Sequence, residues 1–148
     1  MDVREVSCEL LTKENACLMD AALAGLNESD ELSVDPARLR DFLACSHNLA
    51  FIAKYQGQVC GFAYGYSLMS LTAAPQLFVY SVDVLRPFQN NGIGSKMFQY
   101  MVDYSKENGY SECFVITDKA NKRACRVYEK AGGKNDFEDE IVYVIKHS

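Results

Sequence analysis

The sequence predicts an α/β domain with a mixed, mostly antiparallel sheet and flanking helices. Helical patterns come early, an apolar hairpin follows, and the second half alternates strand, helix, strand, helix and strand. Apolar residues make up 49% of the 148 residues, which suits one sizeable core. We therefore expect a single domain over residues 1–148.

The first half is predicted to hold a strand, two helices and a hairpin. Thr12 is the expected cap of the first helix, and Asp35-Pro36 places a good N-cap before a proline at the first helical position of the second. Gly61 and Gly65 either weaken the second hairpin strand or mark a close approach. The expected ranges are 3–10 (strand), 12–26 and 36–45 (helices), and 48–55 and 59–70 (hairpin).

The second half is predicted to begin with a central strand at 77–85, which is β-branched and aromatic with Asp83 as its only charge. A helix follows from Ile93, because apolar residues recur there with helical spacing, and Asn108-Gly109 ends it. A strand at 111–117, a short helix at 121–131 and a last strand at 140–146 complete the pattern.

Composition and charge exclude several classes of protein. The net charge of −5 argues against a general nucleic-acid binder. No apolar run is long enough to span a membrane, and no secretory pattern opens the chain, so we expect a cytoplasmic protein. The six cysteines form no C-x-x-C pair and are expected to be reduced thiols. With only two histidines, no metal site is expected.

Two glycines, Gly92 and Gly94, stand where a loop becomes a helix, although glycine costs about 1 kcal/mol inside a helix. The unpaired amides and the positive dipole of a helix start favour a phosphate, and glycine lets it approach the backbone. The stretch matches neither a Walker A loop nor the G-x-G-x-x-G dinucleotide pattern. Residues 89–94 do read Q-x-x-G-x-G.

At these residues the chain resembles the GNAT superfamily of acyl-CoA-dependent N-acyltransferases, whose central motif is [Q/R]-x-x-G-x-[G/A]. A second stretch, "NKRACRVYEKAGG" at 121–133, is similar to the family's N-x-x-A-x-x-x-Y-x-K-x-G-F segment. The order of elements over roughly 51–145 also agrees. Two positions depart from the pattern: Arg86 stands where proline is common, and Gly133, where phenylalanine is usual, is expected to weaken packing at the helix exit.

The resemblance implies acetyl-CoA as the acyl-donor cosubstrate, with its diphosphate on the amides of the glycine loop. It also implies a central strand that splays from its neighbour, so that the pantetheine arm pairs with a free edge at Val82 and Val84. Asn121 would bond this arm or cap its helix, and Lys96 would be a further cation or a solvated lysine. The implied loop residues are Gln89, Asn90, Asn91, Gly92, Ile93, Gly94 and Ser95.

The implied chemistry is direct attack of a primary amine on the thioester. A backbone amide near Val84 would stabilise the oxyanion, and Tyr128 would protonate the leaving thiolate, unless it is a core aromatic. Asp83 is the local candidate for the base that takes the proton of the ammonium. A water chain or a carboxylate of the acidic loop is the alternative, the loop residues being Glu28, Asp30 and Glu31.

The acceptor is expected to be a small cationic amine, because two acidic clusters flank the expected pocket: Glu28, Asp30, Glu31 and Asp35, then Asp136, Glu138, Asp139 and Glu140. The layout is similar to aminoglycoside 3-N-acetyltransferases, which carry tyrosine then aspartate where this chain has Tyr80-Ser81, with the acid at Asp83. Polyamines and protein amino groups stay open. So do a homodimer, an acyl-CoA-binding module without catalysis, and a plain nucleotide-binding domain.

Overall fold

The computed structural model describes residues 1–17, 19 and 34–147, and within them one five-stranded sheet of order β1-β2-β3-β4-β5. Neighbouring strands from β1 to β4 are antiparallel, whereas β4 and β5 are parallel. The predicted mixed, mostly antiparallel sheet is confirmed. The strands are β1 (Ser7–Leu11), β2 (Asn48–Tyr55), β3 (Gln58–Leu68), β4 (Gln76–Val84) and β5 (Glu112–Val115).

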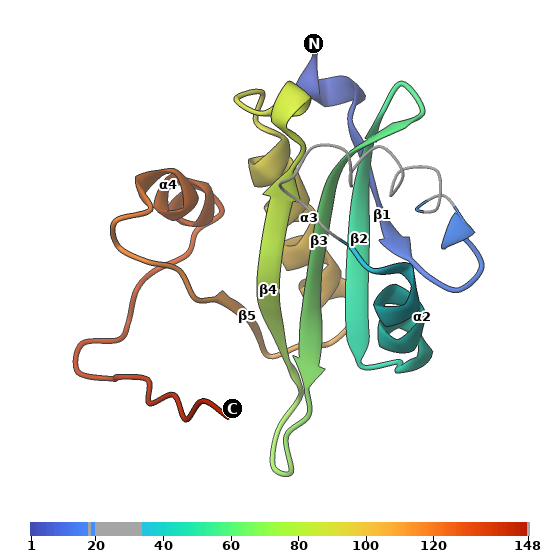
Figure 1. Ribbon diagram of the computed structural model, residues 1–148. Helices are drawn as coiled ribbons and strands as arrows, with labels where there is room; N and C mark the ends of the chain where they lie inside the picture. Colours follow the sequence, from blue (N-terminus) through green and yellow to red (C-terminus); the bar gives the residue numbers. More distant parts are fainter. Residues whose placement is uncertain (18, 20–33, 148) are drawn as a thin grey trace.

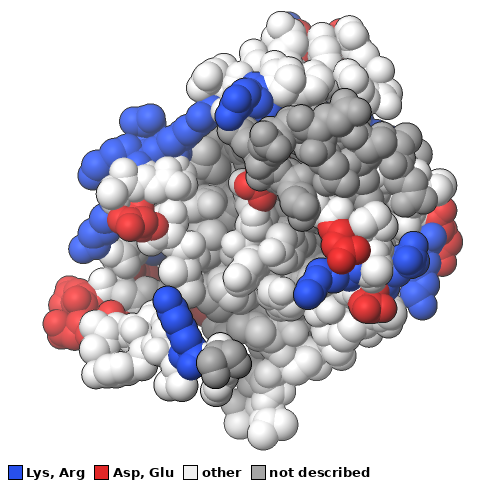
Figure 2. All heavy atoms as spheres, viewed as in Figure 1, with Lys and Arg blue, Asp and Glu red and all other residues white. Residues whose placement is uncertain are grey.

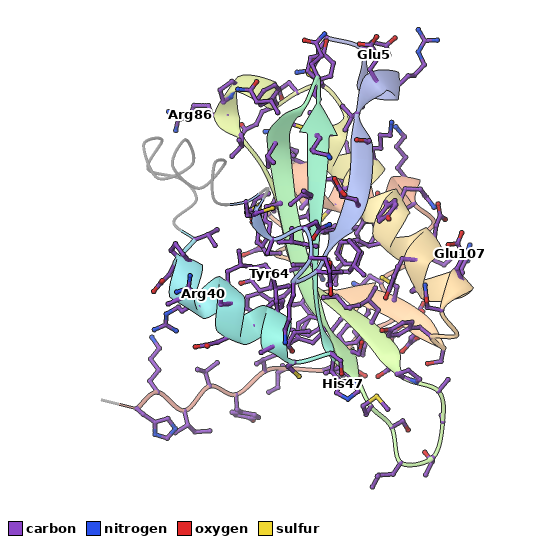
Figure 3. The ribbon with its side chains drawn as sticks, turned by 90° about the vertical axis from the view of Figure 1, so that its right-hand side faces the viewer. Glu5, Arg40, His47, Tyr64, Arg86 and Glu107 are labelled. Carbon is purple, nitrogen blue, oxygen red and sulfur yellow. The ribbon has the colours of Figure 1, made fainter. Side chains whose placement is uncertain are left out.

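Helices cover both faces of this sheet. Figure 3 shows α2 (Pro36–Ala44) and α3 (Ile93–Glu107) on its opposite sides, and Figure 1 shows α4 (Lys122–Lys130) set apart to the left of the sheet. The apolar stripe of α3 packs on one face through Ile93, Met97 and Met101. Leu39 of α2 packs on the other face. The sheet therefore separates two apolar cores.

Local signals account for most element boundaries. The carboxylate of Asp35 accepts a hydrogen bond from the amide of Ala37 at 2.9 Å, as expected of an N-cap before Pro36. At the end of α3, the side chain of Asn108 donates to the carbonyl of Tyr104 at 2.8 Å, and Gly109 has a φ of +78°. The predicted start of α2 and the predicted end of α3 are thus confirmed within one or two residues.

The N-terminal strand begins later than predicted. Residues Val3–Glu5 form a 3-10 helix, η1, because the carboxylate of Asp2 caps it by accepting from the amide of Arg4 at 2.9 Å. At Thr12, the amide donates to Oδ1 of Asn15 at 2.6 Å. Residues 13–16 form a turn, so the prediction that Thr12 caps a helix is wrong. Most of the helix predicted at 12–26 lies outside the described residues.

The last predicted strand, at 140–146, is wrong. This described stretch pairs with no strand, and each residue from Ile141 to Ile145 is between 71% and 82% exposed. Figure 1 shows the chain after α4 running clear of the sheet. Alternating β-branched residues favour an extended chain, but a strand also needs a neighbouring backbone to bond with.

A β-bulge interrupts the ladder between β3 and β4. Tyr64 is opposite Ser81 and Gly65 is opposite Val79, so Tyr80 is an extra residue without a partner. A Cβ on Gly65 would lie 2.2 Å from the carbonyl oxygen of Phe78, and one on Gly61 would lie 2.6 Å from Sδ of Met97. Of the two interpretations of these glycines, close approach is the correct one.

All six cysteines are free thiols in the structure. Burial raises the pKa of Cys60 and of Cys113 to about 11, whereas Cys17 and Cys45 are exposed. We expect iodoacetamide at pH 7.5 to modify the two exposed cysteines at least about 100-fold faster than Cys60, because the thiolate is the nucleophile. Peptide mass spectrometry over time measures this, and equal rates at Cys45 and Cys60 would contradict it.

Candidate active site

A cavity of about 540 Å³ lies where β4, the loop after it and α4 meet. It is lined by eleven of the twelve residues that the sequence predicts as site residues, Asn91 being the exception. The eleven are Val82, Asp83, Val84, Gln89, Asn90, Gly92, Ile93, Gly94, Ser95, Asn121 and Tyr128. The structure thus brings together parts of the chain that are up to 46 residues apart in sequence.

One wall of the cavity is the open edge of β4. The parallel pairing with β5 ends at Val79 and Val115, so β4 continues beyond it with one edge unpaired by β5. The amide of Leu85 donates to the carbonyl of Cys60 on β3 at 2.9 Å. Because successive amides of a strand alternate in direction, the amide of Val84 points to the opposite, open edge.

The loop after β4 is held by its own polar side chains. Nε2 of Gln89 donates to the carbonyl of Val84 at 3.0 Å, across a short 3-10 helix, η2 (Arg86–Phe88). Nδ2 of Asn91 donates to the carbonyls of Phe88 and Gln89 at 3.1 and 3.0 Å. Gln89 and Asn91 therefore shape the loop, and Asn91 does so from outside the cavity lining.

The start of α3 presents free backbone donors to the cavity. Gly92 is the N-cap with a φ of +82°, a left-handed conformation that favours glycine, and none of the described side chains caps the helix there. The first intrahelical amide is that of Lys96, which donates to the carbonyl of Gly92 at 3.1 Å. A Cβ on Gly94 would meet Cγ2 of Val84 at 3.8 Å, an ordinary contact. Protein packing thus does not require glycine at 94.

Lys96 has neither of the two predicted roles. Its ammonium donates to the carbonyl of Val3 at 2.9 Å and to that of Arg4 at 3.4 Å. The lysine therefore anchors η1 against the first turn of α3.

The first turn of α4 closes the cavity on the far side. Oδ1 of Asn121 accepts from the amide of Ala124 at 3.1 Å, so the capping interpretation of Asn121 is confirmed. Nη2 of Arg123 donates to Oδ1 of Asn90 at 2.9 Å, which ties α4 to the glycine loop. Asn90 has a φ of +65°, a conformation that asparagine tolerates better than most residues.

Four lining residues escaped the sequence analysis: Phe88, Arg123, Ala124 and Val127. Their position in the sequence was the available signal for three of them. Arg123, Ala124 and Val127 lie within five residues of Tyr128, on the same helix. Arg123 supplies a guanidinium directly beside the glycine loop.

Tyr128 is a half-buried side chain whose ring packs edge-on against Phe98, with 4.7 Å between ring centroids. Burial raises the pKa of Tyr128, and the negative charge of Asp83 raises it further. The hydroxyl therefore keeps its proton at neutral pH.

After α4, the backbone amide of Gly133 donates to the carbonyl of Tyr128 at 2.9 Å, and a Cβ at position 133 would lie 2.8 Å from that oxygen. The close approach of the backbone at the end of α4 therefore favours glycine at position 133, where the family pattern usually has phenylalanine.

Asp83 is the carboxylate that the described structure offers to this cavity. The hydroxyl of Ser81 donates to Oδ2 of Asp83, so the two lie on one face of β4, as their spacing predicts.

Of the other predicted acidic residues, Glu28, Asp30 and Glu31 lie outside the described residues. Asp35 caps α2, and the second acidic cluster lies on the exposed stretch after α4. Among the described residues, no group of His, Cys, Asp and Glu could hold a metal ion.

No helix in the described ranges is long and apolar enough to cross a membrane.

Comparison with known proteins adds independent findings. The model of the "Acetyltransferase (GNAT) family" matches residues 19–133. No curated protein is similar enough in sequence to count as a match. Among solved structures, the aminoglycoside acetyltransferase meta-AAC0020 from an uncultured soil metagenomic sample, in complex with sisomicin, is 21% identical, with a TM-score of 0.75. The alignment covers 98% of this chain and 97% of that one.

Two further structures have the same fold. The ribosomal-protein-alanine N-acetyltransferase from Brucella melitensis biovar Abortus 2308 is 20% identical with a TM-score of 0.73, over 97% and 99% of the two chains. AAC(6')-Iy, in complex with the bisubstrate analog CoA-S-monomethyl-acetylneamine, is 18% identical with a TM-score of 0.73, again over 97% and 99%. The family model covers well over half of the residues and includes the glycine loop and Tyr128, and on this evidence the chain belongs to the GNAT family of acetyltransferases.

Proposed function

We propose that this chain, acting as one domain over residues 1–148, transfers the acetyl group of acetyl-CoA to a primary amine of a small cationic molecule such as an aminoglycoside. One observation carries the proposal. A single cavity joins an uncapped helix start, an open strand edge and a tyrosine that keeps its proton. These are the parts needed to bind a diphosphate, align an extended arm and supply a proton.

The residues present fit the donor. The amides from Asn91 to Ser95 would bind the diphosphate, because a helix start offers unpaired donors and a positive dipole. Gly94 has room for a ligand that a larger side chain would exclude, and Arg123 adds a cation. Val82 and Val84 would pair with the pantetheine arm through their open-edge backbone groups.

The donor supplies an activated acetyl group as a thioester. Around it, the amide of Val84 is aimed to stabilise negative charge on the carbonyl oxygen. Asp83, held by Ser81, accepts the proton that the acceptor ammonium must lose. Tyr128 donates its hydroxyl proton to the departing sulfur. Burial and the negative charge of Asp83 raise the pKa of Tyr128, so the phenol has a proton to donate.

The choice of acceptor is supported by charge and by analogy. The net charge of −5 favours a cation, and two structures with this fold are described as aminoglycoside acetyltransferases. Polyamines and protein amino groups are the competing acceptors, because another structure of the same fold is a ribosomal-protein-alanine N-acetyltransferase.

The donor site is tested by Gly94→Asp, with Gly94→Ala as the matched control. A carboxylate in the first turn stabilises a helix, so Gly94→Asp is expected to keep the melting temperature. The same charge repels a diphosphate, and we expect CoA affinity, measured by calorimetry, to fall by about 100-fold or more, roughly 3 kcal/mol. Gly94→Ala is expected to stay within about tenfold of the unmodified chain.

Unchanged CoA binding by Gly94→Asp would overturn the site assignment. In parallel, mass spectrometry of an amine panel incubated with acetyl-CoA tests the reaction itself. Tight CoA binding without acetylation of any amine would instead identify an acyl-CoA-binding module.

A further inference from the structure

A group of aromatic side chains covers the face of the sheet that is turned toward α2, next to the candidate active site. We call it the aromatic wall, and Figure 3 shows its member Tyr64 between the sheet and that helix. In Figure 2, lysines and arginines lie mainly around the rim of the described surface, and much of its middle is uncharged. The members of the aromatic wall are Phe42, Tyr64, Tyr66, Phe78 and Tyr80.

Tyr80 is the exposed centre of this wall. Its ring centroid lies 5.3 Å from that of Tyr64, 5.9 Å from that of Tyr66 and 5.9 Å from that of Phe78. Phe42 of α2 packs edge-on against Tyr64 and Tyr66, with ring centroids 5.5 and 5.7 Å apart. Tyr80 nonetheless stays 57% exposed. Packed neighbours thus hold a ring that still presents surface to a ligand.

The β-bulge at Tyr80 places a carboxylate on this same face. In a regular strand, residues 80 and 83 would point to opposite faces. The extra residue shifts the alternation, so that Ser81 pairs opposite Tyr64 and Asp83 opposite Phe62. Asp83 therefore shares a face with the wall, whereas Val82 and Val84 pack toward α3.

Electrostatics link the wall to the cavity. Burial and the neighbouring Tyr66, Tyr80 and Asp83 raise the pKa of Tyr64. The charge of Asp83 acts in the same direction on Tyr128. Asp83 thus lies within electrostatic reach of both the wall and the proposed proton donor.

Electron-rich ring faces beside a carboxylate attract cations. The nitrogen that attacks the thioester must be neutral, so it gains nothing from the rings at the moment of reaction. We propose that the aromatic wall binds a second, still charged ammonium group of the acceptor, with Tyr80 as the residue that determines this specificity. The inference rests on the proposed acetyltransferase function and narrows its substrates to primary amines that carry another ammonium.

Three acceptors of similar length test this: 1,5-diaminopentane, 5-aminopentan-1-ol and hexylamine. We expect kcat/KM for the diamine to exceed that of both monoamines by about tenfold, mainly through a lower KM. Tyr80→Leu should remove the preference, bringing kcat/KM for the diamine within about twofold of the monoamines, and Tyr80→Phe, which keeps the ring, should retain it. Because Tyr80 is exposed, both variants are expected to fold, and circular dichroism checks this.

The outcomes are distinguishable. Equal use of all three acceptors, a preference for hexylamine, or an unchanged diamine preference in Tyr80→Leu would overturn the inference and leave the acetyltransferase function standing. Failure to acetylate these or any other amines would overturn the function, and the inference with it.

Discussion

Replacing Tyr128 with phenylalanine is expected to lower kcat by about 100-fold or more while CoA affinity stays within about twofold, because general acids contribute roughly 10²–10⁴ to rates. The substitution removes only the hydroxyl, and the ring keeps its edge contact with Phe98. Steady-state kinetics and calorimetric CoA titration measure the two effects separately.

The expected pH dependence of kcat follows from the direction in which the pKa of Tyr128 is shifted. The pKa of Tyr128 is raised above its ordinary value, so the protonated, active form persists to higher pH than for a free phenol. Loss of activity below pH 9 would therefore need another titrating group. The matched control is Tyr104→Phe, a half-buried tyrosine on α3 that packs against Phe51 at 5.4 Å, away from the cavity. Equal losses of kcat and CoA affinity in Tyr128→Phe would rule out the acid role.

Gly65→Ala is expected to lower the free energy of unfolding by about 2–3 kcal/mol, the upper part of the usual range for overpacking. The new Cβ would lie 2.2 Å from the carbonyl oxygen of Phe78, and a backbone atom cannot rotate away. The β-bulge itself must shift to relieve the clash. Urea denaturation measures the effect.

The control for this prediction is Gly94→Ala, where the added Cβ meets Cγ2 of Val84 at 3.8 Å. We expect that variant to lie within about 0.5 kcal/mol of the unmodified chain or to be more stable, since alanine is the better helix former. Equal stability of the two variants would mean that the bulge accommodates a side chain. The carbonyl of Phe78 would then not be what requires glycine at position 65.

Sequence reasoning succeeded where a structural feature is encoded over a few neighbouring residues. The cap at Asp35-Pro36, the stop at Asn108-Gly109 and the glycine loop from Gln89 to Gly94 are all local, and the structure agrees with each. The cap formed by Asp2 is equally local, but the β-branched pattern after it pointed to a strand instead.

The misses concern relations between distant segments. Tyr80 is an extra residue only because Gly65 on β3 pairs with Val79, which no pattern within β4 reveals. The stretch 140–146 has a strand's alternation but no neighbouring backbone in the sheet. Arg123 looks like an ordinary exposed helix residue until the fold brings it to Asn90.

The exposed thiols of Cys17 and Cys45 limit the choice of assay for turnover. The proposed transfer would release one CoA per turnover, whose sulfhydryl reacts with aromatic disulfide reagents, but Cys17 and Cys45 are exposed to the same reagents. The absorbance from labelled protein thiols would then rise before the absorbance from released CoA. Slower labelling of the partly buried cysteines would add a gradual increase in the baseline absorbance. Chromatographic quantification of CoA, or the fall in thioester absorbance, separates catalysis from labelling of the enzyme.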